Sequence, residues 1–184
     1  MTGSFHIRCA ARSEVPALQA LIAASARALQ TSDYTPEQIE AALDTVYGVD
    51  TVLIEDGTYF VAVSDSDPAD FAGCGGWSKH KTLYGADGWT KRDDDLLNPA
   101  TDAAKVRAFF IYPAWARRGV GTALLDACES AAREAGFRRC EMGATLTGVK
   151  LFAARGYRHI ERIEIPVGDE IQLTVIRMEK SLAP

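Results

Sequence analysis

The chain has 184 residues, a length that suits one domain with a sizeable hydrophobic core. Hydrophobic residues make up 47% of it, yet no uninterrupted apolar stretch approaches the ~20 residues of a membrane span, so we expect no membrane partner. The formal net charge of −5 argues against a nucleic-acid partner held by a general basic surface. The polar segment from Met1 to Ser13 lacks the apolar run of a secretory signal, which makes the cytoplasm the expected compartment.

The cysteines and histidines are too scattered to indicate a metal site. There is no Cys-x-x-Cys pair, and the soft ligands are widely separated: Cys9, Cys74, Cys128 and Cys140, with His6, His80 and His159. This spacing favours neither a zinc site nor a disulfide framework, so we expect no metal and free, buried thiols.

The N-terminal part predicts a strand followed by two helices. Apolar and polar residues alternate over residues 5–9, as in a half-buried strand. Ser13 can cap a helix whose apolar residues recur at helical spacing as far as Leu29. Thr-Pro-Glu-Gln at 35–38 combines a capping box with proline at the first helical position, which predicts a second helix running to Gly48.

Antiparallel strands and a long loop are expected next. Residues 52–55 and 58–63 indicate a strand or hairpin broken at the Asp-Gly pair between them, and residues 71–78 a further strand. The glycines inside that further strand indicate bulges or the close approach of another backbone or a ligand. Residues 79–102 are polar and charged and predict a long loop, which contacts the acceptor, contacts the partner in a homodimer, or is disordered.

The C-terminal half alternates strands and helices. Residues 106–112 show a buried-strand pattern closed by proline, and residues 122–135 an amphipathic helix with Glu129 on its polar face. After them we expect a strand at 139–144, a short helix at 149–155 capped by Thr147, and a hairpin of 158–166 and 171–179. This order predicts an α/β sandwich with a mixed sheet and helices on both faces.

The junction before the helix at 122–135 carries the strongest functional signal. Arg117-Arg118-Gly119-Val120-Gly121-Thr122 indicates a small-residue turn at a helix start, where about four backbone N–H groups lack partners and roughly half a positive charge gathers. No acid occurs from Arg117 to Leu125, so this end is open to a bound anion such as phosphate. The alternative is tight packing beside solvated arginines. The third glycine of a dinucleotide-binding loop and the Gly-Lys-Ser/Thr of a P-loop are both missing.

In context, this turn resembles a known cofactor motif. The run Phe109-Phe110-Ile111-Tyr112-Pro113-Ala114-Trp115-Ala116-Arg117-Arg118-Gly119-Val120-Gly121-Thr122-Ala123-Leu124-Leu125 is similar to the acetyl-CoA motif of the GNAT superfamily of N-acetyltransferases. The family pattern is Gln/Arg-x-x-Gly-x-Gly/Ala, and its first position falls on Ala116, so that side chain is missing. The resemblance implies one GNAT-like domain over residues 1–184. Its mixed, mostly antiparallel sheet would have about seven strands with helices on both faces, and strands 106–112 and 139–144 would splay apart around the cofactor.

The same resemblance implies a cofactor and a binding site. Acetyl-CoA would be the co-substrate, attacked directly in a ternary complex by a primary amine of a small molecule or peptide. The residues expected to bind the cofactor are Phe110, Ile111 and Tyr112 of the strand, Arg117, Arg118, Gly119, Val120, Gly121 and Thr122 of the turn, and Thr145 and Phe152 beyond it. Main-chain groups of the strand would hold the pantetheine arm, and amides of the turn the diphosphate.

Three positions depart from the family's catalytic pattern. Phe152 occupies the position of an acidic Tyr, Thr145 that of an Asn, and Lys105 that of the Glu found in lysine-acetylating relatives. We therefore expect substitutes, which are His80 as the first candidate base, Glu141 acting through water, and Tyr84 or Tyr112 as the acid.

Two other functions remain open. Phe152 and Lys105 also fit a catalytically weak or inactive acyl-CoA-binding sensor or interaction module. The turn alone fits an enzyme that binds nucleotide phosphates. The sequence does not identify the acceptor, because its pocket side chains would come from separate loops.

Overall fold

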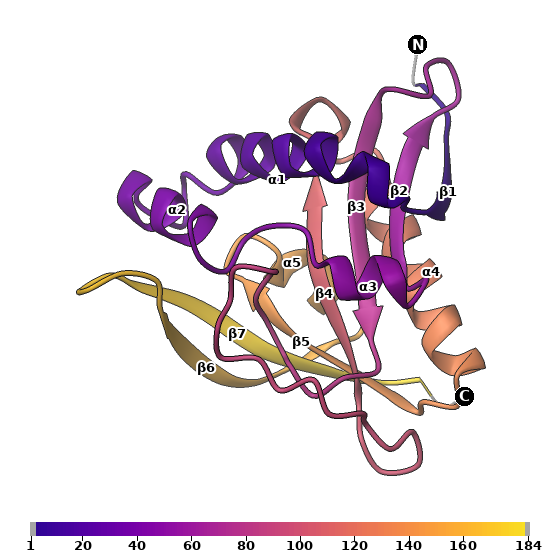
Figure 1. Cartoon of the computed structure of the whole chain (residues 1–184), viewed down its shortest axis with the longest axis vertical. Coiled ribbons are helices and arrows are strands. Elements are labelled where there is room, and N and C mark those ends of the chain that lie inside the picture. The colour runs from indigo at the N-terminus through magenta and orange to yellow at the C-terminus, as the bar shows by residue number, and fades with distance from the viewer. Residues whose placement is uncertain (1–2, 183–184) are drawn as a thin grey trace.

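The computed structural model describes residues 3–182, which form a seven-stranded sheet with helices packed against it (Figure 1). The strands are β1 (Phe5–Cys9), β2 (Tyr59–Ser64), β3 (Phe71–Ser78), β4 (Ala104–Ile111), β5 (Arg139–Thr145), β6 (Arg158–Pro166) and β7 (Gln172–Ser181). The helices are α1 (Val15–Leu29), α2 (Pro36–Leu43), α3 (Thr51–Glu55), α4 (Val120–Glu134) and α5 (Val149–Ala154), with 3-10 turns η1 (Arg12–Glu14) and η2 (Pro113–Trp115). The sheet order is β1-β2-β3-β4-β5-β7-β6.

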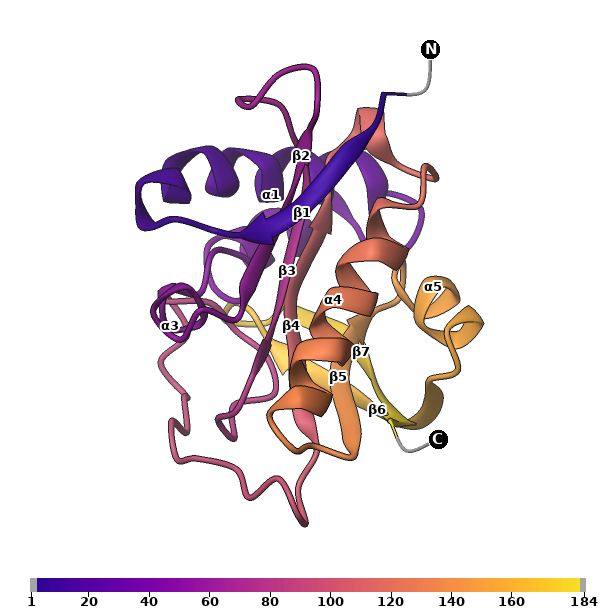
Figure 2. The same ribbon diagram turned by 90° about the vertical axis from the view of Figure 1, so that its right-hand side faces the viewer.

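Different helices cover the two faces of the sheet (Figures 1 and 2). On one face α1 lies over β3 and β4, and its Leu18 and Ile22 share a core with Leu53 and Tyr59. On the other face α4 crosses β2, β3 and β4, and its Leu125 belongs to a second core. The predicted fold class is therefore confirmed. Within residues 3–182, no helix combines the length and apolar character that crossing a lipid bilayer requires.

Strand pairing is antiparallel except between β4 and β5. These parallel strands pair through Ala104 with Cys140 and Lys105 with Glu141. Beyond that point β4 continues along β3 as far as Ile111, and β5 continues along β7. The two strands therefore diverge toward their carboxyl ends, as Figure 1 shows and as the resemblance implied. In the register of the described strands, the β5-facing backbone groups of β4 have no strand partner there.

The glycines of β3 allow the close contacts that the sequence indicated. The register of β3 against β4 shifts between Cys74 and Gly76, which is the expected irregularity. A Cβ at Gly75 would come within 2.4 Å of the Phe109 ring, and one at Gly76 within 2.7 Å of the Thr58 carbonyl oxygen. Larger residues would therefore push β3 away from its neighbours.

The expected strand or hairpin at residues 52–63 is wrong in its first half. Thr51–Glu55 is helix α3, and the strand begins only at Tyr59. Asp50 is the N-cap of α3, and its carboxylate accepts the Val52 N–H at 3.2 Å. The Val-Leu-Ile run fits either structure by its local preference, and burial of Leu53 under α1 favours the helix.

Two helix caps also differ from expectation. Ser13 lies in η1, where the neighbouring Glu14 carboxylate accepts a backbone N–H at 2.7 Å and α1 begins after it. Before α5 the N-cap is Gly148, and the Thr147 hydroxyl donates instead to Asp33 at 2.7 Å. The competing group is thus a sequence neighbour at α1, and at α5 it is Asp33, which is distant in sequence.

Two further expectations need correction. Helix α2 ends at Leu43 rather than at Gly48, because the chain then turns and Tyr47 N–H bonds back to Ala42 at 2.7 Å. The four cysteines are free, but Cys9 is exposed on edge strand β1, and the other three are buried.

Glu129 of α4 lies in the interior, although helical periodicity assigned it to the polar face. It is 3% exposed, and the Lys180 ammonium of β7 donates to its two carboxylate oxygens at 2.8 and 2.9 Å. A buried carboxylate is tolerated when a cation pairs with it. The partner is supplied by the final strand, so no local pattern in α4 predicts it.

We expect Lys180→Met to lower the free energy of unfolding by about 3 kcal/mol, because it leaves the buried Glu129 carboxylate without its main cation. Urea denaturation at neutral pH measures the change. Arg133→Met is the matched control, since Arg133 is more exposed and lies 3.7 Å from the same carboxylate. Its loss should cost less than about 1 kcal/mol. Equal costs for the two variants would contradict the prediction.

Candidate active site

The N-terminus of α4 has the glycine turn that the sequence predicted. Gly119 is its N-cap, in a left-handed conformation with φ of 84° that favours glycine. The N–H of Ala123 donates to the Gly119 carbonyl at 3.0 Å, whereas those of Val120, Gly121 and Thr122 precede the first intrahelical bond. The first turn contains no acid. This helix end therefore offers backbone donors and the positive end of its dipole to an anion.

Gly121 and Arg117 shape the approach to this helix end. A Cβ at Gly121 would lie 2.9 Å from the side chain of Leu151, so glycine allows α5 to pack close to the turn. Arg117 has a φ of 63°, a left-handed conformation that costs a non-glycine residue about 1 kcal/mol. Strained residues of this kind occur preferentially at functional sites.

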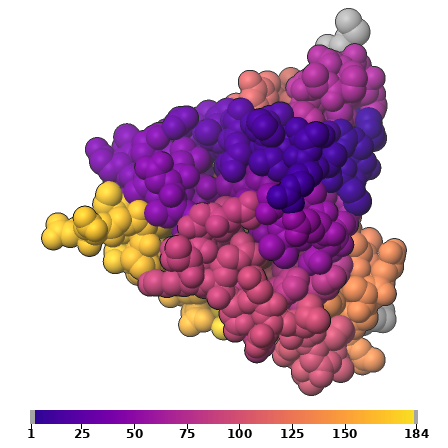
Figure 3. Space-filling model, viewed as in Figure 1, coloured from indigo at the N-terminus to yellow at the C-terminus, as the bar shows by residue number. Residues whose placement is uncertain are grey.

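A cavity of about 730 Å³ lies between the diverging strands β4 and β5. The part that we call the α4 end is lined by the turn and α5, including Arg117, Gly119, Gly121, Thr122 and Lys150. The part that we call the α1 end is lined by Ser25, Gln30, Tyr47, Tyr84, Gly85 and Arg107. Figure 3 shows residues 79–102, in rose, lying over the middle of the face that carries α1 and α2.

The charged side chains that line this cavity are cations. Arg117 and Lys150 lie at the α4 end and Arg107 at the α1 end. Within the described residues, no Asp or Glu lines the cavity. The wall is therefore suited to an anionic ligand at the α4 end, even though the whole chain carries a net charge of −5.

Most residues predicted to bind a cofactor line this cavity, namely Phe110, Ile111, Arg117, Gly119, Gly121, Thr122, Thr145 and Phe152. Three do not. The Tyr112 N–H donates to a carbonyl at the start of β3 at 2.9 Å, Arg118 stacks over Trp115 at 5.4 Å from the ring centroid, and Val120 packs in the core. Of the two arginines, Arg117 is thus the one placed to meet a ligand. The binding roles themselves stay predictions.

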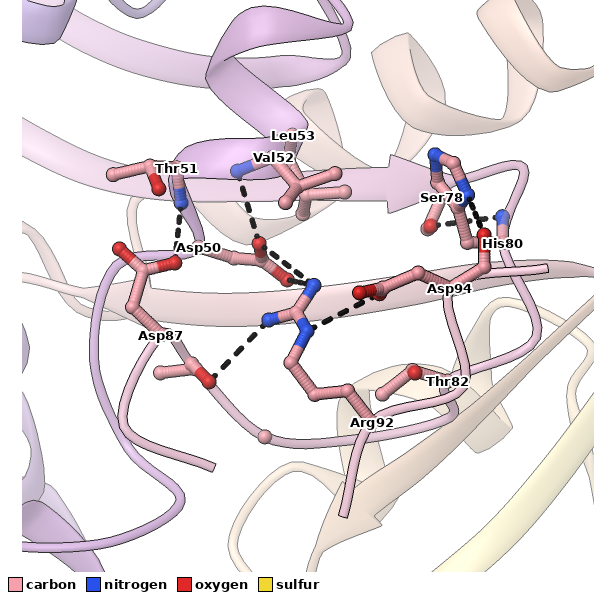
Figure 4. A network of polar contacts seen from close by, with 12 residues as sticks. Asp50, Thr51, Val52, Leu53, Ser78, His80, Thr82, Asp87, Arg92 and Asp94 are labelled. Atoms are coloured by element: carbon pink, nitrogen blue, oxygen red, sulfur yellow. Dashed lines mark hydrogen bonds and ion pairs between the residues drawn. The ribbon is translucent and has the colours of Figure 1, made fainter. Parts of the chain in front are cut away.

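His80, the first candidate base, lies away from the cavity. It follows β3 at the end where Ser78 pairs with Lys105, whereas the cavity opens at the other end of β4. Its Nδ1 contacts the Asp94 carbonyl at 2.8 Å and its Nε2 the Asp56 carboxylate at 2.9 Å. Figure 4 shows His80 in the loop network beside Asp94. A general base must reach the amine, so this position does not support His80 in that role.

Glu141, the second candidate base, is held in a buried ion network. It is 6% exposed, the Lys105 ammonium donates to one carboxylate oxygen, and the Arg177 guanidinium donates to the other at 2.8 Å. Burial raises the pKa of Glu141, but the hydrogen bonds and charges of the two cations outweigh it and hold the pKa below its ordinary value of 4.5. Glu141 is not among the lining residues, so it joins β4 to β5 where they meet instead of facing a substrate.

Tyr84 is the catalytic candidate that lines the cavity. Its ring lies over β5, where a Cβ at Gly143 would be 3.5 Å from it, and packs against Trp89 with centroids 5.7 Å apart. Tyr47 also lines the cavity, but its hydroxyl donates to Gln30 at 2.8 Å and burial raises its pKa well above 10. Of these two phenols, Tyr84 is therefore better suited to exchange a proton.

Asp50 and Arg107 form a buried ion pair that was not predicted from the sequence. Asp50 is fully buried, and the Arg107 guanidinium pairs with its carboxylate at 2.8 Å. The sequence did contain a signal, because Arg107 interrupts the otherwise apolar run of residues 106–111 and a buried arginine requires a partner. The partner lies 57 residues earlier, which no local pattern reveals.

These features define a class of protein that binds an anionic ligand between two diverging parallel strands, beside a helix N-terminus. Residues 23–157 match the model of the Acetyltransferase (GNAT) family, and the chain belongs to this family. It is therefore an acyltransferase of the kind that uses a CoA-linked donor.

Solved structures share the fold at low sequence identity. A GCN5-related N-acetyltransferase from Rhodopseudomonas palustris has a TM-score of 0.68 and 22% identity, with 98% of this chain and 96% of that chain covered. PaiA N-acetyltransferase from Thermoplasma acidophilum, solved with coenzyme A, has a TM-score of 0.65 and 13% identity, with 97% and 99% covered. N-acetylglutamate synthase from Neisseria gonorrhoeae has a TM-score of 0.58 and 18% identity, with 100% of this chain and 36% of that chain covered. A search of curated proteins found no match.

We expect the stability lost in Glu141→Gln to depend on pH. Because the pKa of Glu141 is lowered in the folded protein, its ionised carboxylate contributes stability above the unfolded pKa, near 4.5, and loses it as the pH falls through the folded pKa. At pH 7 the variant should be less stable by about 2 kcal/mol, since Lys105 stays buried without its partner. Urea denaturation from pH 7 to pH 3 measures both values.

The matched control is Glu161→Gln, which removes the exposed partner that Arg177 holds at 3.0 Å. Its loss should cost less than about 1 kcal/mol. A gap between wild type and Glu141→Gln that stays constant over this pH range would contradict the assignment.

Proposed function

We propose that the protein transfers an acetyl group from acetyl-CoA to a primary amine of a small molecule or peptide, by direct attack in a ternary complex. The observation that carries this proposal is the cavity that runs from the N-terminus of α4 to the α1 end, between β4 and β5. A donor whose diphosphate binds at the α4 end would present its thioester toward the α1 end. The acceptor amine would then approach the thioester from the α1 end.

The residues of the cavity fit coenzyme A. Backbone N–H groups at residues 120–122, with Arg117 and Lys150, would bind the diphosphate. The unpaired edge of β4 near Phe110 and Ile111 would hydrogen-bond the pantetheine amides as an added strand would. When bound, the cofactor supplies an activated thioester, whose carbonyl a backbone N–H near Ile111 would polarise.

The proton transfers would depend on water and on Tyr84. An attacking amine must be neutral, because an ammonium group has no lone pair. Among the described residues neither a carboxylate nor a histidine lines the cavity, so the amine would lose its proton to water. The Tyr84 hydroxyl would protonate the departing thiolate, and alignment of the two substrates would supply much of the rate.

The fold neighbours support a small acceptor. The structure of the Neisseria gonorrhoeae synthase was solved with coenzyme A and N-acetyl-glutamate, which is an acetylated small amine. A cavity of about 730 Å³ that must also hold the pantetheine arm leaves room for an acceptor of similar size.

A catalytically weak or inactive acyl-CoA-binding module is the second candidate. The absence of an acidic side chain from the described cavity lining favours it, as does Phe152 at the usual position of the acid. Release of free thiol from acetyl-CoA across a panel of amines separates the two functions. Cofactor binding without thiol release on any amine would favour the module, and binding of ATP in place of coenzyme A would overturn both.

We expect Gly119→Asp to bind coenzyme A about 10-fold more weakly than Gly119→Asn, as measured by calorimetry. Both variants place a side chain of the same shape in the same left-handed conformation, and a Cβ at Gly119 meets nothing within 4 Å. The comparison therefore isolates the repulsion between a carboxylate and the diphosphate. Equal affinities of the two variants would contradict the placement of the diphosphate.

We expect Tyr84→Phe to lower kcat about 10-fold or more while the affinity for coenzyme A is retained, because the thiolate loses its proton donor. Steady-state thiol release and calorimetry give the two quantities. His80→Gln is the control, since His80 lies outside the cavity lining and should retain kcat. An unchanged kcat in Tyr84→Phe would remove the phenol from the mechanism.

A further inference from the structure

Arg107 is a buried cation with unused hydrogen-bond donors. The residue is 4% exposed on β4, and its Nη2 contacts the Asp50 carboxylate at 2.8 Å and the Gly85 carbonyl. Its Nε and Nη1 are buried, and no group of residues 3–182 accepts a hydrogen bond from either atom. Buried donors are almost always paired, so two free donors on one guanidinium require an explanation.

Asp50 is already engaged and does not satisfy these donors. Its carboxylate accepts the Val52 N–H at 3.2 Å and contacts the Arg92 guanidinium at 3.3 Å (Figure 4). Arg92 has further acceptors in Asp94 at 3.2 Å and the Ala86 carbonyl at 3.4 Å. Asp50 therefore contacts two arginines and caps a helix at once, and among the described residues it is the one carboxylate that forms an ion pair with Arg107.

The residue that carries these donors lies at the α1 end of the cavity, which is the acceptor side in the proposed function. Arg107 lines the α1 end together with Gly85, whose carbonyl its guanidinium contacts. The other polar groups of this end are neutral, including Gln30, Tyr47 and Tyr84. An anionic group that enters the α1 end would meet a cation and, among the described lining residues, no anion.

We propose that Arg107 binds a carboxylate of the acceptor, so that the substrate is an amine that also bears a carboxylate, as an amino acid does. This inference rests on the proposed function, since it concerns the acceptor of that reaction. A carboxylate is favoured over a phosphate because it carries a single charge and its two oxygens suit the few donors available.

The contact requires a small rearrangement. The Arg107 side chain is 1% exposed, and the Gly85 carbonyl accepts a hydrogen bond from its Nη2. A carboxylate would accept hydrogen bonds from the free Nε and Nη1, and residues 83–85 would shift to admit it. The acceptor thus binds where the 79–102 loop contacts β4, which gives that loop a role in substrate binding.

The test measures binding, so it does not depend on turnover. Wild-type protein saturated with coenzyme A is titrated calorimetrically with N-acetylated alanine, phenylalanine, glutamate and glutamine, each as the free acid and as the α-amide. At least one acid should bind about 10-fold or more tightly than its amide. Equal binding of acid and amide in every pair, or tighter binding of phosphate-bearing analogues than of the acids, would overturn the proposal.

Two variants test whether Arg107 is the residue that causes the preference for the acid over the amide. Arg107→Gln should abolish the difference between acid and amide and leave the affinity for coenzyme A unchanged. Arg12→Gln is the control, because it removes an exposed arginine outside the cavity lining and should retain the difference. A preference for the acid that persists in Arg107→Gln would overturn the assignment. The wild-type comparison stands even where a variant fails to fold.

Failure of the proposed function and failure of the carboxylate site would give different combinations of binding and thiol release. If the acids bind more tightly than their amides but no amino acid causes thiol release, the proposed enzymatic activity is contradicted and the carboxylate site is still supported. The opposite result is that the protein releases thiol equally fast with free amino acids, amino-acid amides and simple amines, and shows no preference for acids in binding. This result would overturn the carboxylate site but would still support an acetyltransferase.

Discussion

The parting of β4 from β5 is the constraint on which the rest of the site depends. Two parallel strands that begin as neighbours and then separate leave a row of backbone donors and acceptors without a strand partner. In a closed core, each such group would cost about 1 to 3 kcal/mol. Here they border a cavity, where a ligand with amide groups can pair with them. The buried ion pair of Lys105 and Glu141 joins the strands at the closed end, so the opening is confined to the other end.

The charge around this opening is positive, opposite in sign to the net charge of the whole chain. The protein is acidic overall, yet the described cavity wall carries cations at both ends and the N-terminus of α4 adds its dipole. Two acids form buried ion pairs instead of the roles predicted from the sequence. Glu141, a predicted catalytic base, pairs with Lys105, and Glu129, a predicted surface residue, pairs with Lys180. An enzyme with this wall would attract anions and leave proton removal to water.

The loop of residues 79–102 completes the α1 end of the cavity. Its two arms bond to each other, with Lys81 N–H to Asp95 and Thr82 N–H to Asp93, both at 3.0 Å. Arg92 then ties the loop to the fully buried Asp50. Of the roles that the sequence left open for this loop, contact with the acceptor is favoured, because its Tyr84 and Gly85 line the α1 end together with Arg107 of β4.

Whereas the divergence of β4 from β5 was implied by the family resemblance, local patterns in the sequence determined the strand-turn-helix unit around Gly119 and the order of nearly all elements. These depend on neighbours in the chain, such as a glycine that permits a left-handed turn or an amphipathic period. The helix at Thr51–Glu55, the burial of Glu129 and the occupied nitrogens of His80 were decided by partners far along the chain. The same holds for Arg107, whose carboxylate partner Asp50 reaches it only once α3 packs on the sheet. Tertiary structure alone fixes such pairs, because a buried charge is stabilised by whichever opposite charge the folded chain brings within contact.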